Sequence, residues 1–503
     1  MNFSKLKLSS LFKKECLVLY IIVIFGSFLR LQGVFTNSFA FTYDVGRDML
    51  ALWNIVYLHK IPLIGATTGL PGVFYGPWWY YMLSPFFLIF SGNPQGIAFV
   101  MALVGISTII MGFVLGKRIG GIFLGLILAL FLGISHDMIS LSSQIWNPNI
   151  TPLFVIFVLL ILQKIYSSNK KETIAFFFLG ILLALNIDLE IIFGSLFSIG
   201  IILSVPLVLR GKINFKEILA FIVGILVIFS PRIFFELRHG FLMTKSLLAF
   251  FVHSPLSQSV SSSSTILNKL GTMLNQFNAT LAFDNMILGI LFLVFISASL
   301  VFLYKKAEKQ IKNFIRTSMT VILVFIFGTA FLNHDVWPHY LVSVPVFYIL
   351  LFAISLNLIR KNMSKNIFYF FSIFFILIFL FVDLVPIVRG NLKPLWEGDA
   401  SVYRNQVAVI DYVYDNAQGK DFKYVVYTPP VHDYTYQYLF MWYGQKMYHY
   451  TPKTQANLAF FILEPDMQYP SRLKDWLVQR AGDGKIIKSQ TVKGGIIVQT
   501  RIH

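Results

Sequence analysis

The sequence predicts a mainly α-helical membrane protein that crosses the bilayer many times and ends in a small α/β domain. The 503 residues are 56% hydrophobic and only 13% charged, whereas soluble domains are roughly a quarter charged. Apolar runs long enough to cross a bilayer recur along most of the chain. Residues 388–503 lack such runs, so a separate domain is expected there.

The apolar runs predict 11 membrane-crossing helices. They are expected at 17–35, 97–115, 119–136, 150–165, 173–187, 191–209, 216–232, 286–304, 314–332, 340–359 and 366–387. The first run follows a basic stretch and is long enough to span, so it is expected to anchor the chain rather than to be cleaved.

The basic residues predict the orientation. With the N-terminus in the cytoplasm, the predicted cytoplasmic segments hold 20 of the 41 Lys and Arg residues, as the positive-inside rule requires. The first outer loop, 36–96, holds only Arg47 and Lys60. This topology requires that the aromatic run 77–92 does not cross, and its short length favours an interfacial or re-entrant segment. We therefore expect a plasma (inner) membrane protein, and the net charge of +18 does not indicate nucleic-acid binding.

Two units are expected, a transmembrane module at 1–389 and an outer domain at 390–503. In the outer domain, 400–417 predicts a helix. Strands are predicted at 424–430, 458–465 and 485–502, the last as a hairpin that turns at Gly494-Gly495. The serine-rich run 257–266 predicts a flexible stretch within a long outer loop, 233–285. The single cysteine, Cys16, excludes a disulfide framework.

The stretch FTYDVGRDML at 41–50 places charge beside hydrocarbon, where charge is costly. If this region is helical, Asp44, Arg47 and Asp48 lie at i, i+3 and i+4 on one face. The pattern predicts a helix along the membrane surface that holds its acids near the outer leaflet. An ion pair on a solvated helix face, without a function, is the plainer alternative.

The first outer loop and three later segments resemble the GT-C superfamily of membrane glycosyltransferases. Within it, the chain is most similar to bacterial relatives of protein O-mannosyltransferases (glycosyltransferase family 39) and of lipid A aminoarabinose transferases. Their [D/E]-x-x-R-[D/E]-M pattern is matched by DVGRDM at 44–49. The segments that also resemble the superfamily are YGPWWYYML (75–83), QIWNPNITPL (144–153), SPRIFFELRHGF (230–241) and WPHYL (337–341). The resemblance covers about residues 1–390.

The resemblance implies transfer of a sugar, with inversion, from a polyprenyl-phosphate carrier to a lipid, glycan or protein acceptor on the outer face. It implies a catalytic role for Asp44, with Arg47 and Asp48 positioning it. Such chemistry needs a base for the acceptor hydroxyl and donors for the departing phosphate. Val45 stands where protein O-mannosyltransferases usually carry a second acid, which disfavours a protein acceptor. No metal ligands are assigned, and a need for a divalent metal stays open.

The candidate substrate-binding residues are polar or aromatic and lie in outer loops or at outer helix ends. They are Arg30, Tyr75, Trp146, Asn147, Asp188, Arg232, Arg238, His339 and Tyr340. Several have a plainer alternative: Arg30 could simply reach the interface, the Trp146-Asn147 segment could be a turn, and Asp188 could be a helix-end acid in water. A metal site at His334, Asp335 and His339 is disfavoured because the spacing matches no standard ligand set.

Two other functions remain open at the level of the sequence. A transporter or flippase of a lipid-linked saccharide would carry polar residues at mid-depth and usually internal repeats. The predicted helix centres are apolar and the acids collect at one face, which favours the enzyme. A non-catalytic assembly factor with an outer binding domain is the third alternative.

Overall fold

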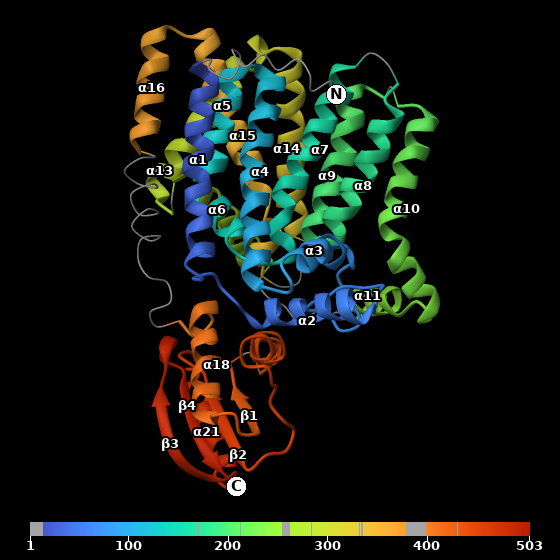
Figure 1. The fold of residues 1–503 in the computed structure, drawn as a ribbon. Coiled ribbons are helices and arrows are strands. Elements are labelled where there is room, and N and C mark those ends of the chain that lie inside the picture. The colour runs from blue at the N-terminus through green and yellow to red at the C-terminus, as the bar shows by residue number, and fades with distance from the viewer. Residues whose placement is uncertain are drawn as a thin grey trace, which may run out of the picture.

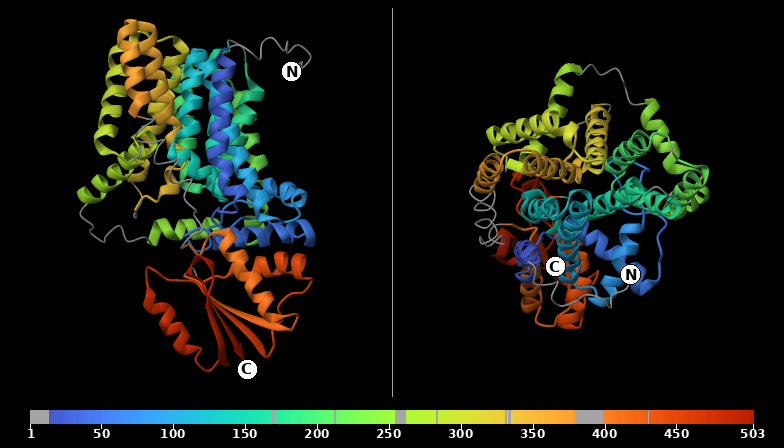
Figure 2. Two further views of the ribbon diagram at one scale, coloured as in Figure 1. Left: turned by 60° about the vertical axis from the view of Figure 1, so that its left-hand side comes forward. Right: turned by 90° about the horizontal axis from the view of Figure 1, so that it is seen from above.

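The computed structural model describes residues 14–168, 171–211, 213–253, 262–282, 284–330, 332, 335–378, 399–429 and 431–503. Within these residues the chain forms a bundle of long helices, with a small sheet-containing domain at one end of the bundle (Figure 1). Figure 2 shows the same arrangement from the side and along the helices of the bundle. The predicted class, a polytopic α-helical protein with a C-terminal α/β domain, is confirmed.

Eight helices of the described residues are long and apolar enough to cross a membrane. They are α1 (Lys14–Phe35), α4 (Pro94–Gly120), α7 (Thr151–Ser167), α9 (Ile191–Leu209), α10 (Phe215–Arg238), α13 (Met286–Leu303), α14 (Lys309–Ala330) and α15 (Val344–Asn362). The count rises to 9 if α5 (Ile122–Ile134) and α6 (His136–Ser142), bent by 62°, form one span.

Two further apolar helices, α8 (Thr173–Leu189) and α16 (Lys365–Ile378), are shorter than these eight. The expected total of 11 spans is therefore not confirmed. Part of the last predicted span, 379–387, lies outside the described residues.

The first outer loop contains two short helices, α2 (Tyr43–Leu58) and α3 (Trp78–Ile89). The 12 residues of α3 reach only about 18 Å at 1.5 Å per residue, against a hydrocarbon core of about 30 Å. Both helices lie at the end of the bundle that faces the C-terminal domain (Figure 1). This geometry agrees with the prediction that 77–92 does not cross.

The region predicted as a long outer loop is largely helical. Helix α10 continues to Arg238, six residues beyond its predicted end, and is followed by α11 (Leu242–His253) and α12 (Ser262–Ala282). The end of the serine-rich run forms the first turn of α12 rather than a flexible stretch, and residues 257–261 of that run lie outside the described residues. The apolar residues farther along α12, such as Phe277 and Leu281, are buried in the bundle. Tertiary packing therefore outweighs the low helix propensity of serine here.

The C-terminal domain is a four-stranded sheet with helices. Its strands are β1 (Phe422–Tyr427), β2 (Leu458–Leu463), β3 (Lys485–Thr491) and β4 (Ile497–Ile502), in the order β1-β2-β4-β3. Strands β1 and β2 are parallel, while β4 pairs antiparallel with both neighbours. The helices are α18 (Tyr403–Ala417), α19 (Tyr434–Leu439), α20 (Gln445–Tyr448) and α21 (Pro470–Gln479), with a π-helical turn at Phe440–Gly444.

The hairpin predicted at Gly494-Gly495 is present. Both glycines have positive φ angles, 73° and 71°, a region that residues with a side chain rarely adopt. The predicted helix 400–417 corresponds to α18, and the predicted strands 424–430 and 458–465 correspond to β1 and β2.

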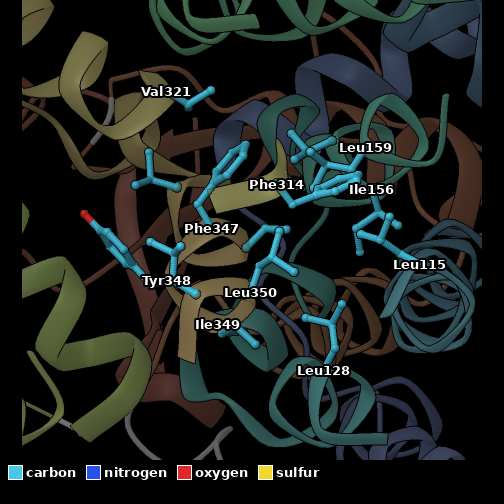
Figure 3. Packing of buried hydrophobic residues seen from close by; sticks show 14 of the residues in the cluster. Leu115, Leu128, Ile156, Leu159, Phe314, Val321, Phe347, Tyr348, Ile349 and Leu350 are labelled. Atoms are coloured by element: carbon cyan, nitrogen blue, oxygen red, sulfur yellow. The ribbon is translucent and has the colours of Figure 1, made fainter. Parts of the chain in front are cut away.

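The main core surrounds α15. Its residues from Val344 to Ile359 are all buried, as expected for a helix that is hydrophobic on every side. Figure 3 shows Phe347, Ile349 and Leu350 of α15 packed among side chains of α4, α5, α7 and α14. This central helix fixes the positions of the helices around it.

A second core joins the first outer loop to the C-terminal domain. Phe41 and Val45 pack in one buried cluster with Tyr436 and Tyr438. Gly46 of α2 allows this approach, because a Cβ atom there would lie 2.4 Å from the backbone nitrogen of Thr435. The C-terminal domain is therefore docked on α2 by close backbone contact.

Candidate functional site

A cleft of about 980 Å³ lies between the start of α2, the segment before α7 and the C-terminal domain. Its polar wall residues from the first two loops are Thr42, Tyr43, Asp44, Gln144 and Trp146. Those from the C-terminal domain are Asp399, Ser401, Gln406, Thr428, Thr435 and Glu464. The cleft exists only because the docked domain covers the beginning of α2.

The predicted acid–arginine trio lies at the start of α2, and its first member, Asp44, lines this cleft. Helix α2 starts after Thr42, whose backbone is extended, so Asp44 lies in the first turn, where the helix dipole favours an acid. The Arg47 guanidinium lies between the two acids. Its Nη1 donates to Asp44 Oδ1 at 2.6 Å, and its Nη2 donates to Asp48 Oδ1 at 2.9 Å. The prediction that these three residues share one helix face is confirmed.

The two acids have different environments. The Asp48 side chain is 1% exposed and accepts hydrogen bonds from Trp79 Nε1 at 2.9 Å and from the Tyr80 hydroxyl at 3.0 Å. Asp48 therefore ties α2 to α3 and holds Arg47 in place. The Asp44 side chain is 25% exposed and lines the cleft. Of the two, Asp44 is the carboxylate that a bound molecule can reach.

Burial raises the pKa of Asp44 above its ordinary value of 3.8, although Arg47 acts in the opposite direction. A carboxylate that has lost part of its hydration is a stronger base than one in water. The positive charge of Arg47 stabilises the ionised form of the Asp44 carboxyl group. Asp44 therefore combines the reach and the basicity that proton abstraction needs.

A second polar cluster lies where α8 meets α9. The Tyr75 hydroxyl donates to Glu190 Oε2 at 3.0 Å, and burial raises the pKa of Glu190 to about 8. Asp188 accepts a hydrogen bond from the Trp78 backbone nitrogen at 3.1 Å, and its Oδ1 lies 3.2 Å from Nε of Arg232. These contacts bind the loop before α3 to the end of α8 and to Arg232 within α10.

Close approach of Asp188 depends on a glycine. A Cβ atom added to Gly76 would lie 1.5 Å from Asp188 Oδ1. The backbone nitrogen of Gly76 also donates to the Asp188 carbonyl at 2.9 Å. The glycine of the YGPWW segment is therefore required by packing, which its sequence context alone does not reveal.

The aromatic candidates meet beside this cluster. The Trp146 and His339 rings lie 5.2 Å apart, edge to face, and His339 contacts Tyr340 at 4.6 Å. The Asn147 amide donates to the carbonyl of Leu189, so this buried residue connects the second loop to the α8–α9 junction. Of these four predicted residues, Trp146 lines the cleft itself.

Two predicted residues, Arg30 and Arg238, line neither the cleft nor the cluster around Asp188 and Glu190. Arg30 is 1% exposed and donates to the carbonyls of Gly133 at 2.7 Å and Leu132 at 2.9 Å. It therefore caps the C-terminal end of α5 inside the bundle instead of extending to the interface, because those carbonyls have no partner within their own helix. Arg238 is exposed at the end of α10.

The sequence reasoning missed the wall that the C-terminal domain contributes. Glu464 is 7% exposed and accepts hydrogen bonds from the Thr428 hydroxyl at 2.7 Å and the Tyr436 hydroxyl at 2.9 Å. Burial raises its pKa. Gln406 is 2% exposed, and its Oε1 has no hydrogen-bond partner. An acid directly after the buried strand 458–463 is the signal that marks this position.

Metal ligation was left open by the sequence. Across the part of the chain that the structure describes, no group of three or more His, Cys, Asp or Glu side chains is arranged to hold a metal ion. His334, one residue of the disfavoured metal site, lies outside the described residues.

Comparisons with known proteins identify the fold. No family model matches the chain, and no curated protein matches its sequence. ArnT from Cupriavidus metallidurans, bound to undecaprenyl phosphate, matches with a TM-score of 0.57 at 13% identity, over 96% of this chain and 97% of that chain. ArnT in the apo state matches with a TM-score of 0.49 at 12% identity, over 90% and 97% of the two chains.

The Archaeoglobus fulgidus oligosaccharyltransferase, in complex with Zn and sulfate, matches with a TM-score of 0.49 at 14% identity, over 79% of this chain and 55% of that chain. The match to undecaprenyl-phosphate-bound ArnT, at 13% identity, shows a shared fold. The chain therefore shares its overall fold with that protein.

Proposed function

We propose that the protein is a glycosyltransferase that moves a sugar from a polyprenyl-phosphate-linked donor to an acceptor in the cleft between α2 and the C-terminal domain. One observation carries the proposal: in a fold shared with ArnT, the partly buried carboxylate of Asp44 faces that cleft, held by Arg47. We place the cleft at the outer face of the plasma membrane, with the N-terminus in the cytoplasm, because of the distribution of basic residues.

In the proposed reaction Asp44 accepts the proton of an acceptor hydroxyl. The hydroxyl oxygen attacks the anomeric carbon of the donor as the bond from that carbon to the phosphate oxygen breaks, and polyprenyl phosphate leaves. Attack from the side opposite the phosphate inverts the anomeric configuration. Arg47 supports this step because its charge stabilises the ionised form of Asp44, while Asp48 keeps Arg47 in position.

The donor is proposed to lie on the membrane side of Asp44. The rings of Trp146, His339 and Tyr340 form an aromatic group there, and aromatic faces suit the apolar side of a sugar ring. Arg232, whose side chain is 12% exposed, supplies a cation beside Asp188. A guanidinium is well suited to binding a phosphate, although here it must balance its pairing with Asp188.

The acceptor is proposed to contact the C-terminal domain. Among the described wall residues, that domain contributes the carboxylates of Asp399 and Glu464 and the unpaired Oε1 of Gln406. Such a wall accepts hydrogen bonds and repels negative charge. It therefore favours an acceptor that presents hydroxyl or amino groups over one that presents a phosphate.

The experiment that tests the function is donor turnover. Purified full-length protein and Asp44→Asn would be given a panel of radiolabelled polyprenyl-phosphate sugars with a membrane lipid or glycan extract. We expect wild type to transfer or hydrolyse one donor, and Asp44→Asn to lose about 10²- to 10⁴-fold in rate, the usual range for a general base. Asp421→Asn, an exposed acid of the C-terminal domain, is the matched control.

The outcomes separate the alternatives. Loss in Asp44→Asn with folding and donor binding retained supports the proposed role. Full activity in that variant assigns the base to another residue. No turnover of any donor by wild type contradicts the enzyme proposal and favours a transporter or an assembly factor.

A further inference from the structure

A second cavity, of about 680 Å³, lies where α4 turns into α5 beside the last turn of α15. This is the end of the bundle opposite the C-terminal domain (Figure 1). Its wall includes Gly121, Phe123, Asn357, Arg360 and Lys361. None of these residues takes part in the proposed transfer reaction.

Asn357 lacks hydrogen-bond partners in this cavity. It is 1% exposed, and neither its Oδ1 nor its Nδ2 has a partner. Leaving a buried polar group without a partner is unfavourable, so such groups usually contact a ligand or an ordered water. The amide offers both a donor and an acceptor to whatever occupies the cavity.

The other wall groups select for an anion. Arg360 lies over the Phe123 ring, with its Cζ 4.6 Å from the ring centroid, which holds the guanidinium at the cavity wall. Lys361 adds a second cation, whose Nζ lies 2.6 Å from Oε1 of the exposed Glu308. The two cations thus outweigh the single acid that contacts them.

Helix α5 adds uncapped backbone donors to the same wall. Gly121 precedes its first residue with a φ of 98°, and no side chain caps the first turn of this 13-residue helix. A Cβ atom at Gly121 would meet nothing within 4 Å, so the space in front of the helix N-terminus is open. Backbone N–H groups in this position favour anions such as phosphate.

We propose that this cavity binds a phosphate ester that also carries a hydroxyl group. Arg360, Lys361 and the N-terminus of α5 would bind the phosphate oxygens, with the Asn357 Nδ2 donating to one of them and its Oδ1 accepting from the hydroxyl. Glycerol-phosphate chemistry of this kind occurs in the headgroup of a membrane lipid and in soluble phosphate esters. The proposal is independent of the glycosyltransferase function.

Native mass spectrometry of the full-length protein in detergent tests the proposal. The probes are phosphatidylglycerol, phosphatidylcholine, glycerol 3-phosphate and inorganic phosphate. We expect phosphatidylglycerol or glycerol 3-phosphate to bind, and Arg360→Gln/Lys361→Gln to weaken this binding roughly tenfold, because charge-assisted hydrogen bonds are lost. Lys305→Gln/Lys306→Gln is the matched control. It removes two exposed cations between α13 and α14, which do not line the cavity.

The identity of the bound probe distinguishes the two sources. Binding of phosphatidylglycerol without competition from glycerol 3-phosphate assigns the site to a lipid headgroup, and strong binding of glycerol 3-phosphate assigns it to a soluble ester. Equal binding of phosphatidylglycerol and phosphatidylcholine, with no response to glycerol 3-phosphate or inorganic phosphate, overturns the proposal. Equal loss in the control pair also overturns it, because the effect would then follow from net charge.

Asn357→Leu separates a binding role from a structural one. The substitution replaces the unpaired amide with an apolar group of similar volume, so the ligand-free protein should keep or gain thermal stability while probe binding falls. Reduced stability with unchanged probe binding would show that the amide only supports the fold, and would contradict its assignment to the site.

Discussion

The Asp44 carboxylate and the Arg47 guanidinium lie 2.6 Å apart on adjacent turns of α2, and their side chains remain 25% and 23% exposed. A pair of this kind in full solvent contributes little to stability. This pair differs because Arg47 is also held by the buried Asp48, so its position is fixed before any substrate arrives. The arrangement leaves Asp44 oriented by a cation and still accessible from the cleft.

The first prediction concerns the pH dependence of transfer. Burial raises the pKa of Asp44 and Arg47 lowers it, so activity that needs the ionised carboxylate should fall as the pH drops through a value above 3.8. Arg47→Gln removes the opposing charge and should move this acid limb to higher pH. The measurement is the pH profile of kcat/KM for the labelled donor.

Lys60→Gln serves as the control for this profile, since Lys60 is an exposed cation of the same loop. A profile in Arg47→Gln that coincides with wild type would mean that Asp44 is not the titrating group. Arg47→Lys retains the charge and should keep the acid limb close to its wild-type position, so a shift in this variant equal to that in Arg47→Gln would contradict the electrostatic explanation.

The second prediction concerns stability. Asp48→Asn replaces an acceptor that receives hydrogen bonds from Arg47, Trp79 and Tyr80. The amide NH₂ cannot accept, so at least one buried donor loses its partner, at a cost of about 1–3 kcal/mol. We expect a lower unfolding temperature in detergent, with Asp421→Asn unchanged. Equal stability of the two variants would show that Asp48 is not an anchor for α2.

The sequence predicted those parts of the fold that depend on local pattern. Apolar runs located the membrane helices, and the spacing of Asp44, Arg47 and Asp48 placed them on one helix face. The glycine pair at 494–495 marked the hairpin. These features follow from helical periodicity, hydrocarbon thickness and backbone conformation, which neighbouring residues determine.

The docking of the C-terminal domain could not be predicted in the same way. Its contact with α2 depends on Gly46 meeting Thr435, which lies 389 positions later in the chain. The cleft wall at Gln406 and Glu464 follows from that contact. Arg30 is a second example, because its burial against the end of α5 depends on the packing of two helices. Contacts between distant segments leave no periodic signal in the sequence.

The third prediction uses a pair of glycines. Gly76→Ala would place a Cβ atom 1.5 Å from Asp188 Oδ1, so the loop before α3 or the Asp188–Arg232 pair must shift. We expect loss of transfer activity and a lower unfolding temperature. In Gly69→Ala the nearest atom would be a Trp337 ring carbon at 3.5 Å, an ordinary contact. Similar behaviour of the two variants would contradict a specific role for Gly76.

The last prediction concerns Glu190 and the pH dependence of folding. Burial raises its pKa from 4.5 to about 8, and the hydrogen bond from Tyr75 only partly opposes this. The folded state therefore retains a proton that the unfolded state releases, so the stability from this group is complete below pH 4.5 and is lost as the pH rises through 8. Glu190→Gln carries no titrating group at this position and keeps a similar shape.

We expect the free energy of unfolding of wild type to fall between pH 5 and pH 8 more steeply than that of Glu190→Gln, measured by chemical denaturation in detergent. Parallel curves for the two proteins would show that Glu190 is already ionised in the folded state, with Tyr75 supplying enough stabilisation to offset its burial.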